Sequence, residues 1–218
     1  MPGLRERKKQ RTRELIAETA RRLFGERGFE GVTVAEVAEA AEVSEATVFN
    51  YFPTKEDLFY SGLEAFEEEL LSAIRDRPPG ESALAAFRRF VLEPRGLLSA
   101  RDPEMIDRMA AITRVITQSP ALLAREQRIL AGYTDSLAAL LAEETGAKPG
   151  DIAPRVAANA LIGVHRALLD YARGEAVAGT RNPQLARRVR TQGKRALDLL
   201  ESGLGDYAVK TAQPPRKK

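Results

Sequence analysis

The hydrophobic positions of this chain recur at helical spacing along most of its 218 residues. From about residue 7 to residue 26, apolar side chains stand at i, i+4, i+7 and i+8, the core-facing stripe of an amphipathic helix (Ile16, Ala20, Leu23 and Phe24). A second stripe predicts one continuous helix from Thr54 to just before Pro78, through Leu58, Phe59, Leu63, Phe66, Leu70 and Ile74. Capping residues and prolines then mark helices near 82–92, 104–117, 120–145, 152–173 and 183–203. Strand-like alternation is absent, so the pattern predicts an all-α fold of about nine helices.

The stretch from Thr33 to Lys55 carries two short helices joined by a tight turn. Thr33 followed by Glu36 is a capping box that starts the first helix, and Ser44 can cap the second. The spacing turns Ala46 and Phe49, with Val48 as a further candidate, toward the first helix, and leaves Glu45, Thr47, Asn50 and Tyr51 outside. This pattern predicts a helix-turn-helix. The alternative is a helical hairpin inside an all-α core.

The net charge of +3 is unevenly distributed along the chain. Residues 1–13 hold six Lys or Arg against one Glu, residues 205–218 hold four against one Asp, and the remainder is net negative. A basic arm beside a helix-turn-helix favours electrostatic capture of a phosphate backbone. Two solvated tails are the alternative, which we prefer for the C-terminal end. We therefore expect a helix-turn-helix domain with its basic arm over 1–54, a helical ligand-binding and dimerisation domain over 55–204, and a basic disordered tail over 205–218.

Several classes of function are excluded by what the sequence lacks. It contains no cysteine and a single histidine, His165, which rules out thiolate chemistry and multi-histidine metal sites. There is no GxxxxGK[ST] phosphate loop, no dinucleotide-binding GxGxxG and no Gly-x-Ser-x-Gly nucleophile elbow. We expect neither an enzyme nor a resident metal or cofactor. No apolar run approaches the roughly 20 residues that span a bilayer, and the first residues lack a signal-peptide core, so we expect a cytoplasmic protein without membrane contact.

The segment ARRLFGERGFEGVTVAEVAEAAEVSEATVFNYFPTKEDLF resembles the DNA-binding domain of tetracycline-repressor-type (TetR family) transcription regulators, over about Leu15 to Leu63. Glu42 stands where that family usually has glycine, so the turn either avoids a left-handed conformation or tolerates strain. Phe49 stands where many members have tyrosine, and a hydroxyl is lost. The segment GDIAPRVAANALIGVHRALLDYARG is similar to the carboxyl domain of mycofactocin-type regulators, over roughly residues 80–200. That second resemblance implies an acyl-CoA-like effector.

The residue types of the helix-turn-helix predict a set of DNA contacts. We expect phosphates to be bound by Ser44, Thr47, Tyr51 and Lys55, together with Thr33 and the basic arm, in which Lys9 and Arg11 are the candidates. Asn50 is the candidate for reading a base, since a carboxamide pairs with the major-groove edge of adenine. Glu45 either accepts from the amino group of cytosine or favours the helix N-terminus. Ala46 and Thr47 can contact a thymine methyl group.

The carboxyl helices carry two further candidate sets. The aromatic or adaptable side chains that suit a small-molecule pocket are Phe87, Phe90, Met105, Met109, Ile112, Ile116, Tyr133 and His165. A face of mostly small residues on the helix at 152–173 and an apolar stripe on the last helix predict a dimer interface of Ala157, Ala160, Gly163, Val164, Ala167, Tyr171, Leu185, Val189, Ala196, Leu199 and Leu200. For both sets, core packing within one chain is the alternative.

Together these features predict a ligand-responsive, homodimeric transcriptional repressor that binds a palindromic operator in double-stranded DNA. A small, apolar or acyl-CoA-like effector is expected to release it, by swinging the long helix that starts at Thr54. Two alternatives remain: an architectural DNA-binding protein without a ligand, and a helical module that binds a membrane or a protein partner.

Overall fold

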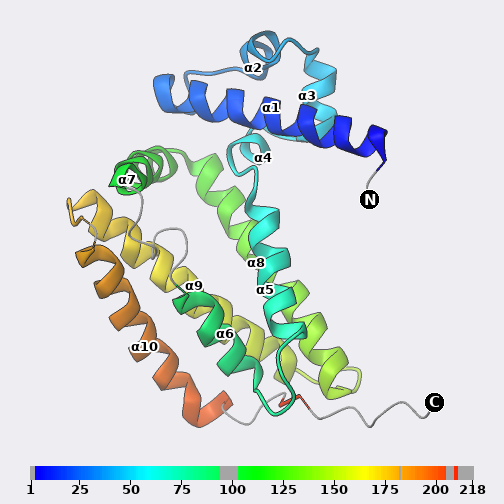
Figure 1. Cartoon of the computed structure of the whole chain (residues 1–218), viewed down its shortest axis with the longest axis vertical. Helices are drawn as coiled ribbons and strands as arrows, with labels where there is room; N and C mark the ends of the chain where they lie inside the picture. The colour runs from blue at the N-terminus through cyan, green and yellow to red at the C-terminus, as the bar shows by residue number, and fades with distance from the viewer. Residues whose placement is uncertain (1–2, 94–102, 182, 205–208, 211–218) are drawn as a thin grey trace. The chain divides into compact units, whose positions relative to one another are not determined.

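The computed structural model describes residues 3–93, 103–181, 183–204 and 209–210. Within these ranges the chain forms ten α-helices and no strand, which confirms the predicted all-α class. In chain order they are α1 (Leu4–Arg27), α2 (Val34–Ala40), α3 (Glu45–Tyr51), α4 (Lys55–Phe59), α5 (Leu63–Arg75), α6 (Ala83–Leu92), α7 (Pro103–Gln118), α8 (Pro120–Thr145), α9 (Ala153–Val177) and α10 (Gln184–Leu204) (Figure 1). They divide into two compact units. Unit 1 comprises residues 1–64 and 111–127, and unit 2 comprises residues 65–110 and 128–218.

The core of unit 1 forms where α1 packs on the short helices that follow it (Figure 1). The predicted stripe of α1 is buried, and Gly28 ends the helix with φ +73°, where its N–H donates to the carbonyl of Phe24. Phe29 then turns inward, with its ring centroid 5.3 Å from that of Phe24 and 5.6 Å from that of Phe59. Positive φ costs glycine little, so Gly28 allows the chain to reverse directly into this aromatic cluster.

The predicted continuous helix after Thr54 is wrong, because the chain breaks between α4 and α5. Residues 60–62 form a turn, and Gly62 has φ +97°, a conformation that an α-helix does not contain. Tyr60 is buried at the break, where its hydroxyl donates to the carbonyl of Leu122 at 3.2 Å. A contact from a distant part of the chain therefore holds the turn, and α4 and α5 are two separate helices.

Residues 111–127, the end of α7 and the start of α8, belong to unit 1, which corrects the predicted boundary at residue 55. Arg125 donates from Nε to Oδ1 of Asp57 at 2.6 Å, and Ser119 donates to Glu30 at 3.0 Å. The other oxygen of Asp57 accepts from the N–H of Thr54 in the capping box that starts α4. One carboxylate thus joins the cap of α4 to the first turns of α8.

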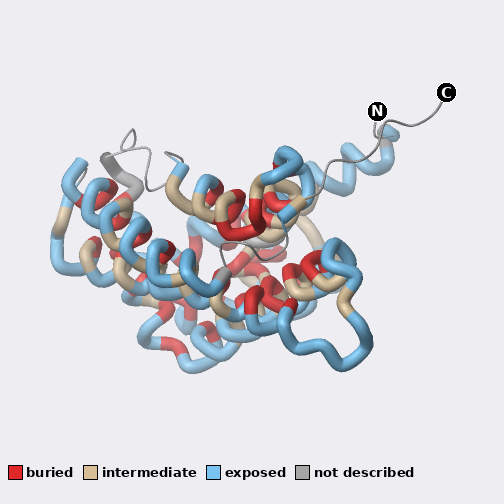
Figure 2. The backbone as a smooth tube through the Cα atoms, turned by 90° about the horizontal axis from the view of Figure 1, so that it is seen from below, coloured by how far each residue is buried: buried red, intermediate tan, exposed pale blue. Residues whose placement is uncertain are grey.

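The core of unit 2 lies among α5, α6, α8, α9 and α10, and α10 packs along both α9 and α6. Figure 2 shows buried stretches alternating with exposed ones along the helices, as amphipathic helices require. The larger of two buried clusters among the described residues of this unit includes Phe87, Leu137, Leu141, Leu161 and Leu197. A second buried cluster joins α7, α9 and α10 through residues such as Ile106, Leu168, Ala172, Leu185 and Val189.

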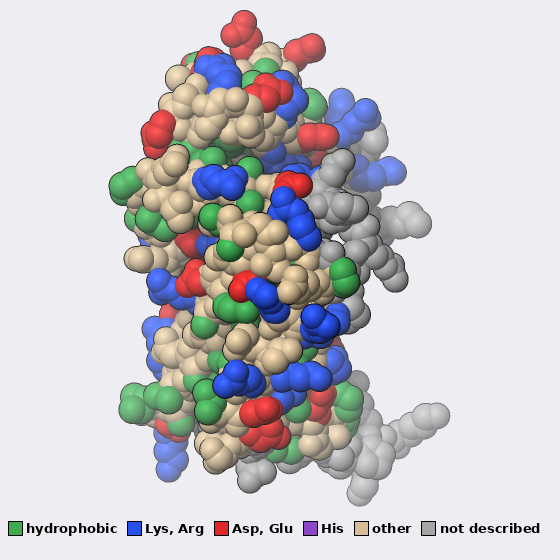
Figure 3. All heavy atoms as spheres, turned by 90° about the vertical axis from the view of Figure 1, so that its left-hand side faces the viewer, with side chains coloured by type: hydrophobic (Ala, Val, Ile, Leu, Met, Phe, Trp, Pro, Cys, Tyr) green, Lys and Arg blue, Asp and Glu red, His purple; other side chains and the backbone are tan. Residues whose placement is uncertain are grey.

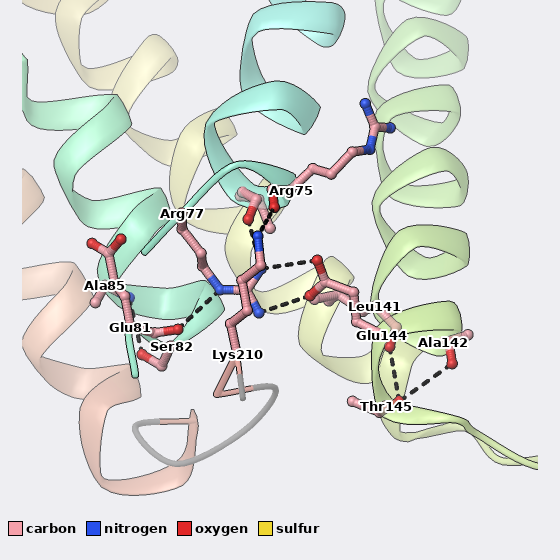
Figure 4. A network of polar contacts seen from close by, with 11 residues as sticks. Arg75, Arg77, Glu81, Ser82, Ala85, Leu141, Ala142, Glu144, Thr145 and Lys210 are labelled. Atoms are coloured by element: carbon pink, nitrogen blue, oxygen red, sulfur yellow. Dashed lines mark hydrogen bonds and ion pairs between the residues drawn. The ribbon is translucent and has the colours of Figure 1, made fainter. Parts of the chain in front are cut away.

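Among the described residues of unit 2, Arg77 is the buried charged side chain (Figure 4). The guanidinium of Arg77 donates to both carboxylate oxygens of Glu144, at 3.0 and 2.7 Å, and to the carbonyls of Ile74 and Glu81. Beside it, Lys210 donates from Nζ to the carbonyl of Arg75 at 2.6 Å, and its carbonyl accepts from the N–H of Gly80. Lys210 belongs to the predicted disordered tail, whose positions 205–208 and 211–218 lie outside the described residues, so the prediction for the tail stays a prediction.

In the described ranges, no helix combines the length and apolar character needed to cross a bilayer. The same residues contain no group of three His, Asp or Glu side chains placed to hold a metal ion.

Candidate nucleic-acid interface

The two helices of the predicted helix-turn-helix begin at side-chain caps. Thr33 and Glu36 form a complete capping box at α2: the Thr33 hydroxyl accepts from the N–H of Glu36, and the Glu36 carboxylate accepts from the N–H of Thr33 at 2.7 Å. Ser44 caps α3, where its Oγ accepts from the N–H of Thr47 at 3.1 Å and lies 2.8 Å from the Thr47 hydroxyl. Because α2 and α3 have seven residues each, their ends depend on these bonds.

The Glu36 carboxylate also fixes the approach of α1 to α2. Arg27, in the last turn of α1, donates to Glu36 at 2.6 Å and to the carbonyl of Gly31 at 2.6 Å. The backbone N–H of Thr33, followed by the Arg27 guanidinium and the Thr33 hydroxyl, lowers the pKa of Glu36 to about 2. All three partners favour the charged form, so folding of this region is linked to ionisation of Glu36.

We expect Glu36→Gln to destabilise the protein at neutral pH and to lose this effect in acid. A pKa lowered in the folded state gives stability that is complete above the ordinary value of 4.5 and disappears as the pH falls through about 2. Glutamine can still accept the backbone hydrogen bond of the capping box. The difference in unfolding free energy between the two proteins therefore reports the contribution of the Glu36 charge. Urea unfolding followed from pH 7 to pH 2 measures it. Parallel stability curves for the two proteins would contradict the linkage.

The turn between α2 and α3 contains a strained residue. Glu42 has φ +54° and is the one non-glycine with positive φ among the described residues. The sequence left open whether this position avoids the left-handed conformation, and the structure shows that it adopts it. The next N–H, of Val43, donates to the carbonyl of Ala38 at 2.9 Å and closes the turn. The C-terminal end of α2 thus sets the direction in which α3 leaves.

The residues that α3 exposes are not all the predicted ones, because the helix is rotated about its axis relative to the prediction. Val48 is buried at 1% exposure and Phe52, one turn later, at 2%, whereas Phe49 is 46% exposed. Ala46 is exposed as well, so the prediction that Ala46 and Phe49 face the first helix is wrong. The exposed face of α3 comprises Glu45, Ala46, Phe49 and Asn50, while Thr47 and Tyr51 are half-buried. Phe49 is the surface residue that the sequence analysis missed. The sequence does contain a signal for it: Val48 and Phe49 are adjacent and both apolar, so one of them has to face outward.

Two cations of this unit lie over aromatic rings. Nζ of Lys55, in the first turn of α4, is 4.2 Å from the centre of the Phe29 ring. The guanidinium of Arg13 is 5.1 Å from the centre of the Phe52 ring. Rings at this distance attract a cation through their quadrupole and hold it in place. Lys55 therefore begins α4 in a fixed position, as a phosphate-binding group requires.

The basic arm is helical, although the sequence predicts the first helix only from about residue 7 onward. α1 begins at Leu4, and residues 5–11 are exposed around the whole circumference of the helix. Lys9 and Arg11 are among them, and no ion pair involving either is found in the described part of the chain. Thr33 and Ser44, the remaining predicted phosphate contacts, are exposed at the caps of α2 and α3.

The predicted effector residues do not gather in one place. Phe90, Tyr133 and His165 surround Phe66 of α5, with centroids 5.5, 5.6 and 4.5 Å from its ring, and His165 is stacked on it. In the sequence Phe66 is visible only as part of the apolar stripe after Thr54. Phe87 is fully buried in the same core, and Met109 packs on the cluster that joins α7 to α9 and α10. Ile112 and Ile116 belong to unit 1, and the side chain of Met105 lies outside the described residues.

The predicted dimer residues separate into buried and exposed groups. Ala157, Leu185 and Val189 are already buried against their own chain, so their assignment to an interface is wrong. Val164, Tyr171 and Leu200 are partly buried on the same clusters, and Ala160 and Ala196 are half-buried. Gly163, Ala167 and Leu199 remain exposed, and Leu199 is 80% exposed.

The chain matches two family models. The model described as bacterial regulatory proteins, tetR family, covers residues 16–61, and the model described as MftR C-terminal domain covers residues 81–204, more than half of the chain. These matches confirm both resemblances seen in the sequence.

Similar proteins include two transcriptional regulators. TcmR of Streptomyces glaucescens is 34% identical over 147 residues, which is 66% of this chain and 65% of TcmR, slightly less than two thirds of that relative. MftR of Mycobacterium tuberculosis, described as a regulator of mycofactocin biosynthesis, is 28% identical over 72% of this chain and 78% of its own.

Among solved structures, Bacillus subtilis FadR in complex with stearoyl-CoA shares the fold. Its TM-score is 0.52 at 22% identity, over 87% of this chain and 98% of FadR. A structure of a TetR-family regulator from Rhodococcus sp. has a TM-score of 0.50 at 19% identity, over 88% of this chain and 98% of that one.

Proposed function

The chain belongs to the tetR family of bacterial regulatory proteins, and from this premise we propose that it is a dimeric, ligand-responsive repressor of transcription. Each subunit places α3 in a major groove of operator DNA, and two-fold symmetry requires half-sites roughly 34 Å apart. The observation that carries the proposal is the exposed outer face of α3, flanked by the fixed cation of Lys55. Such a protein works in the cytoplasm, where its operator is.

The outer face of α9 supports the dimer. Val156, Gly163, Ala167 and Val177 are all exposed, and their spacing of 7, 4 and 10 residues places them on one side of the helix. Small side chains let a second helix approach closely, and the two valines would gain apolar burial. Figure 3 faces the side of the protein on which α10 lies, where hydrophobic side chains are scattered among charges of both signs. Leu199 of α10 is the most exposed large hydrophobic residue of the described chain.

The proposal is tested by selecting bound sites from random DNA with purified protein and with its Asn50→Ala variant. We expect the parent protein to enrich a palindrome with two half-sites one helical turn apart. Asn50 is exposed on α3, and loss of its contact with adenine should cost about 1–3 kcal/mol and relax the preference at one position of each half-site. No enrichment by the parent protein would refute the function. An unchanged base preference in the variant would remove Asn50 from the base-reading set.

For unit 2 we propose an apolar effector, and specifically an acyl-CoA-like molecule. The aromatic group of Phe66, Phe90, Tyr133 and His165 is the feature that would hold it. Tyr133 lies on the same helix as Arg125, two turns or about 12 Å along α8, and Arg125 holds Asp57 at the cap of α4. We propose that α8, and not a continuous helix after Thr54, transmits effector binding to the cap of α4. Titration of the protein–operator complex with palmitoyl-CoA, and separately with coenzyme A alone, tests this class of effector. We expect palmitoyl-CoA to release the DNA. Equal release by both compounds would refute an effector that binds through its acyl chain.

A further inference from the structure

Phe49 is an exposed aromatic ring at the centre of the surface that the proposed function turns toward DNA. Single exposed hydrophobic residues are common on proteins and mean little by themselves. Phe49 differs in its position, since Ala46, exposed at i−3, lies beside it on the same face of α3. The seven-residue helix therefore presents a small apolar strip between the carboxylate of Glu45 and the carboxamide of Asn50.

The polar groups near this strip are mostly engaged within the protein. The hydroxyls of Ser44 and Thr47 lie 2.8 Å from each other, and Ser44 accepts from the N–H of Thr47. On the exposed face, Glu45 and Asn50 are left as the groups that can exchange hydrogen bonds with base edges. The phenyl ring of Phe49 can neither donate nor accept, so it cannot position the helix on a phosphate. Its contribution at a DNA surface has to be an apolar contact.

Among the base edges in the major groove, thymine alone carries an apolar substituent, the C5-methyl group. Cytosine offers an amino donor at its major-groove edge, which a phenyl ring would desolvate without a partner. We propose that Phe49, with Ala46 beside it, is a specificity-determining residue that selects thymine in each operator half-site through contact with this methyl group. The proposal rests on the proposed function and names the base that this part of the site recognises.

The test uses the operator found by selection and replaces its thymines by uracil, one symmetrical pair at a time. This change removes only the methyl group and keeps every hydrogen-bonding atom. For the parent protein we expect one pair at which affinity falls about fourfold per half-site, the value of one buried methyl-sized group. In Phe49→Ala the same replacement should have no effect, because the contact is already gone. Phe49→Leu should retain most of the dependence on the methyl group.

Asn50→Ala is the matched control on the same face of α3, and it should keep the full sensitivity to uracil. Because Phe49 is half exposed, Phe49→Ala should leave the thermal unfolding midpoint unchanged, so that lost affinity reports the DNA contact. The assignment is overturned if uracil weakens the parent and Phe49→Ala equally at every position, or weakens the parent at none. Failure to select any palindrome would refute the proposed function itself. If a palindrome is selected but uracil and Phe49→Ala weaken binding independently of each other, only the role of Phe49 is refuted.

Discussion

Replacing Glu144 by alanine is expected to lower the free energy of unfolding by about 3 kcal/mol, because it removes the carboxylate that pairs with the buried Arg77 guanidinium. The side chain of Arg77 is 1% exposed, and its guanidinium donates to both carboxylate oxygens of Glu144 (Figure 4). The carbonyls of Ile74 and Glu81 still accept from it, which keeps the loss at the lower end for a broken buried ion pair. Urea unfolding followed by circular dichroism measures the change.

The double variant Arg77→Met, Glu144→Met is the matched control. Apolar side chains of similar length fill the space without burying a charge, so most of the lost stability should return. With the single variants Arg77→Met and Glu144→Met, a double-mutant cycle then isolates the pairing from the loss of packing around each side chain. If Glu144→Ala costs less than about 1 kcal/mol, water reaches the guanidinium and the pair does not join the segment after α5 to α8 as the geometry indicates.

The local signals in the sequence predicted the starts of the short helices correctly. The capping boxes of Thr33 with Glu36 and of Thr54 with Asp57, and the cap at Ser44, join residues three apart. Every group that these bonds need is therefore visible in the sequence. The family resemblance and the all-α class depend on the same short-range pattern.

What the sequence did not predict depends on contacts from distant parts of the chain. Val48 and Phe49 are adjacent and both apolar, so spacing alone permits two phases for α3, and the structure buries Val48. A single glycine is compatible with a helix, and the turn at Gly62 becomes evident only with Tyr60 bonded to Leu122, 62 residues away. On α9, small residues occur on both the buried and the exposed side, so composition could not separate Ala157 from Gly163. No local rule contains this information.

The break at residues 60–62 changes the proposed mechanism of release from DNA. A continuous helix after Thr54 would act as a lever, but the break at residues 60–62 removes it. The cap of α4 is instead joined through Asp57 to Arg125, on a helix that continues into unit 2. A ligand changes DNA affinity only through its differential affinity for two conformations, typically about 1–3 kcal/mol. A carboxylate that serves both a helix cap and an ion pair is a contact that such an energy can break.

Replacing Lys8, Lys9 and Arg11 by glutamine is expected to have the largest effect on operator affinity. These side chains are exposed on the first turns of α1, and glutamine is a good helix former, so the helix should persist. Each phosphate contact contributes about 0.9 to the slope of log K against log salt concentration. With three contacts in each of two subunits, the slope should become shallower by about five, and affinity near 0.1 M salt should fall on the order of 100-fold or more. Fluorescence anisotropy with a labelled operator over a range of salt concentrations measures both.

A second triple variant separates phosphate contact from net charge. Arg75, Arg128 and Lys148 are exposed residues of unit 2, and changing them to glutamine removes the same three charges from each subunit. Long-range attraction alone would make the two variants lose affinity alike, since it depends on total charge and is screened beyond about 10 Å at 0.1 M salt. Direct contact predicts a shallower slope for the α1 variant only. Equal slopes for both variants would show that the basic first turns of α1 steer the protein toward DNA without touching it, and that the contacts reside in the helix-turn-helix and Lys55.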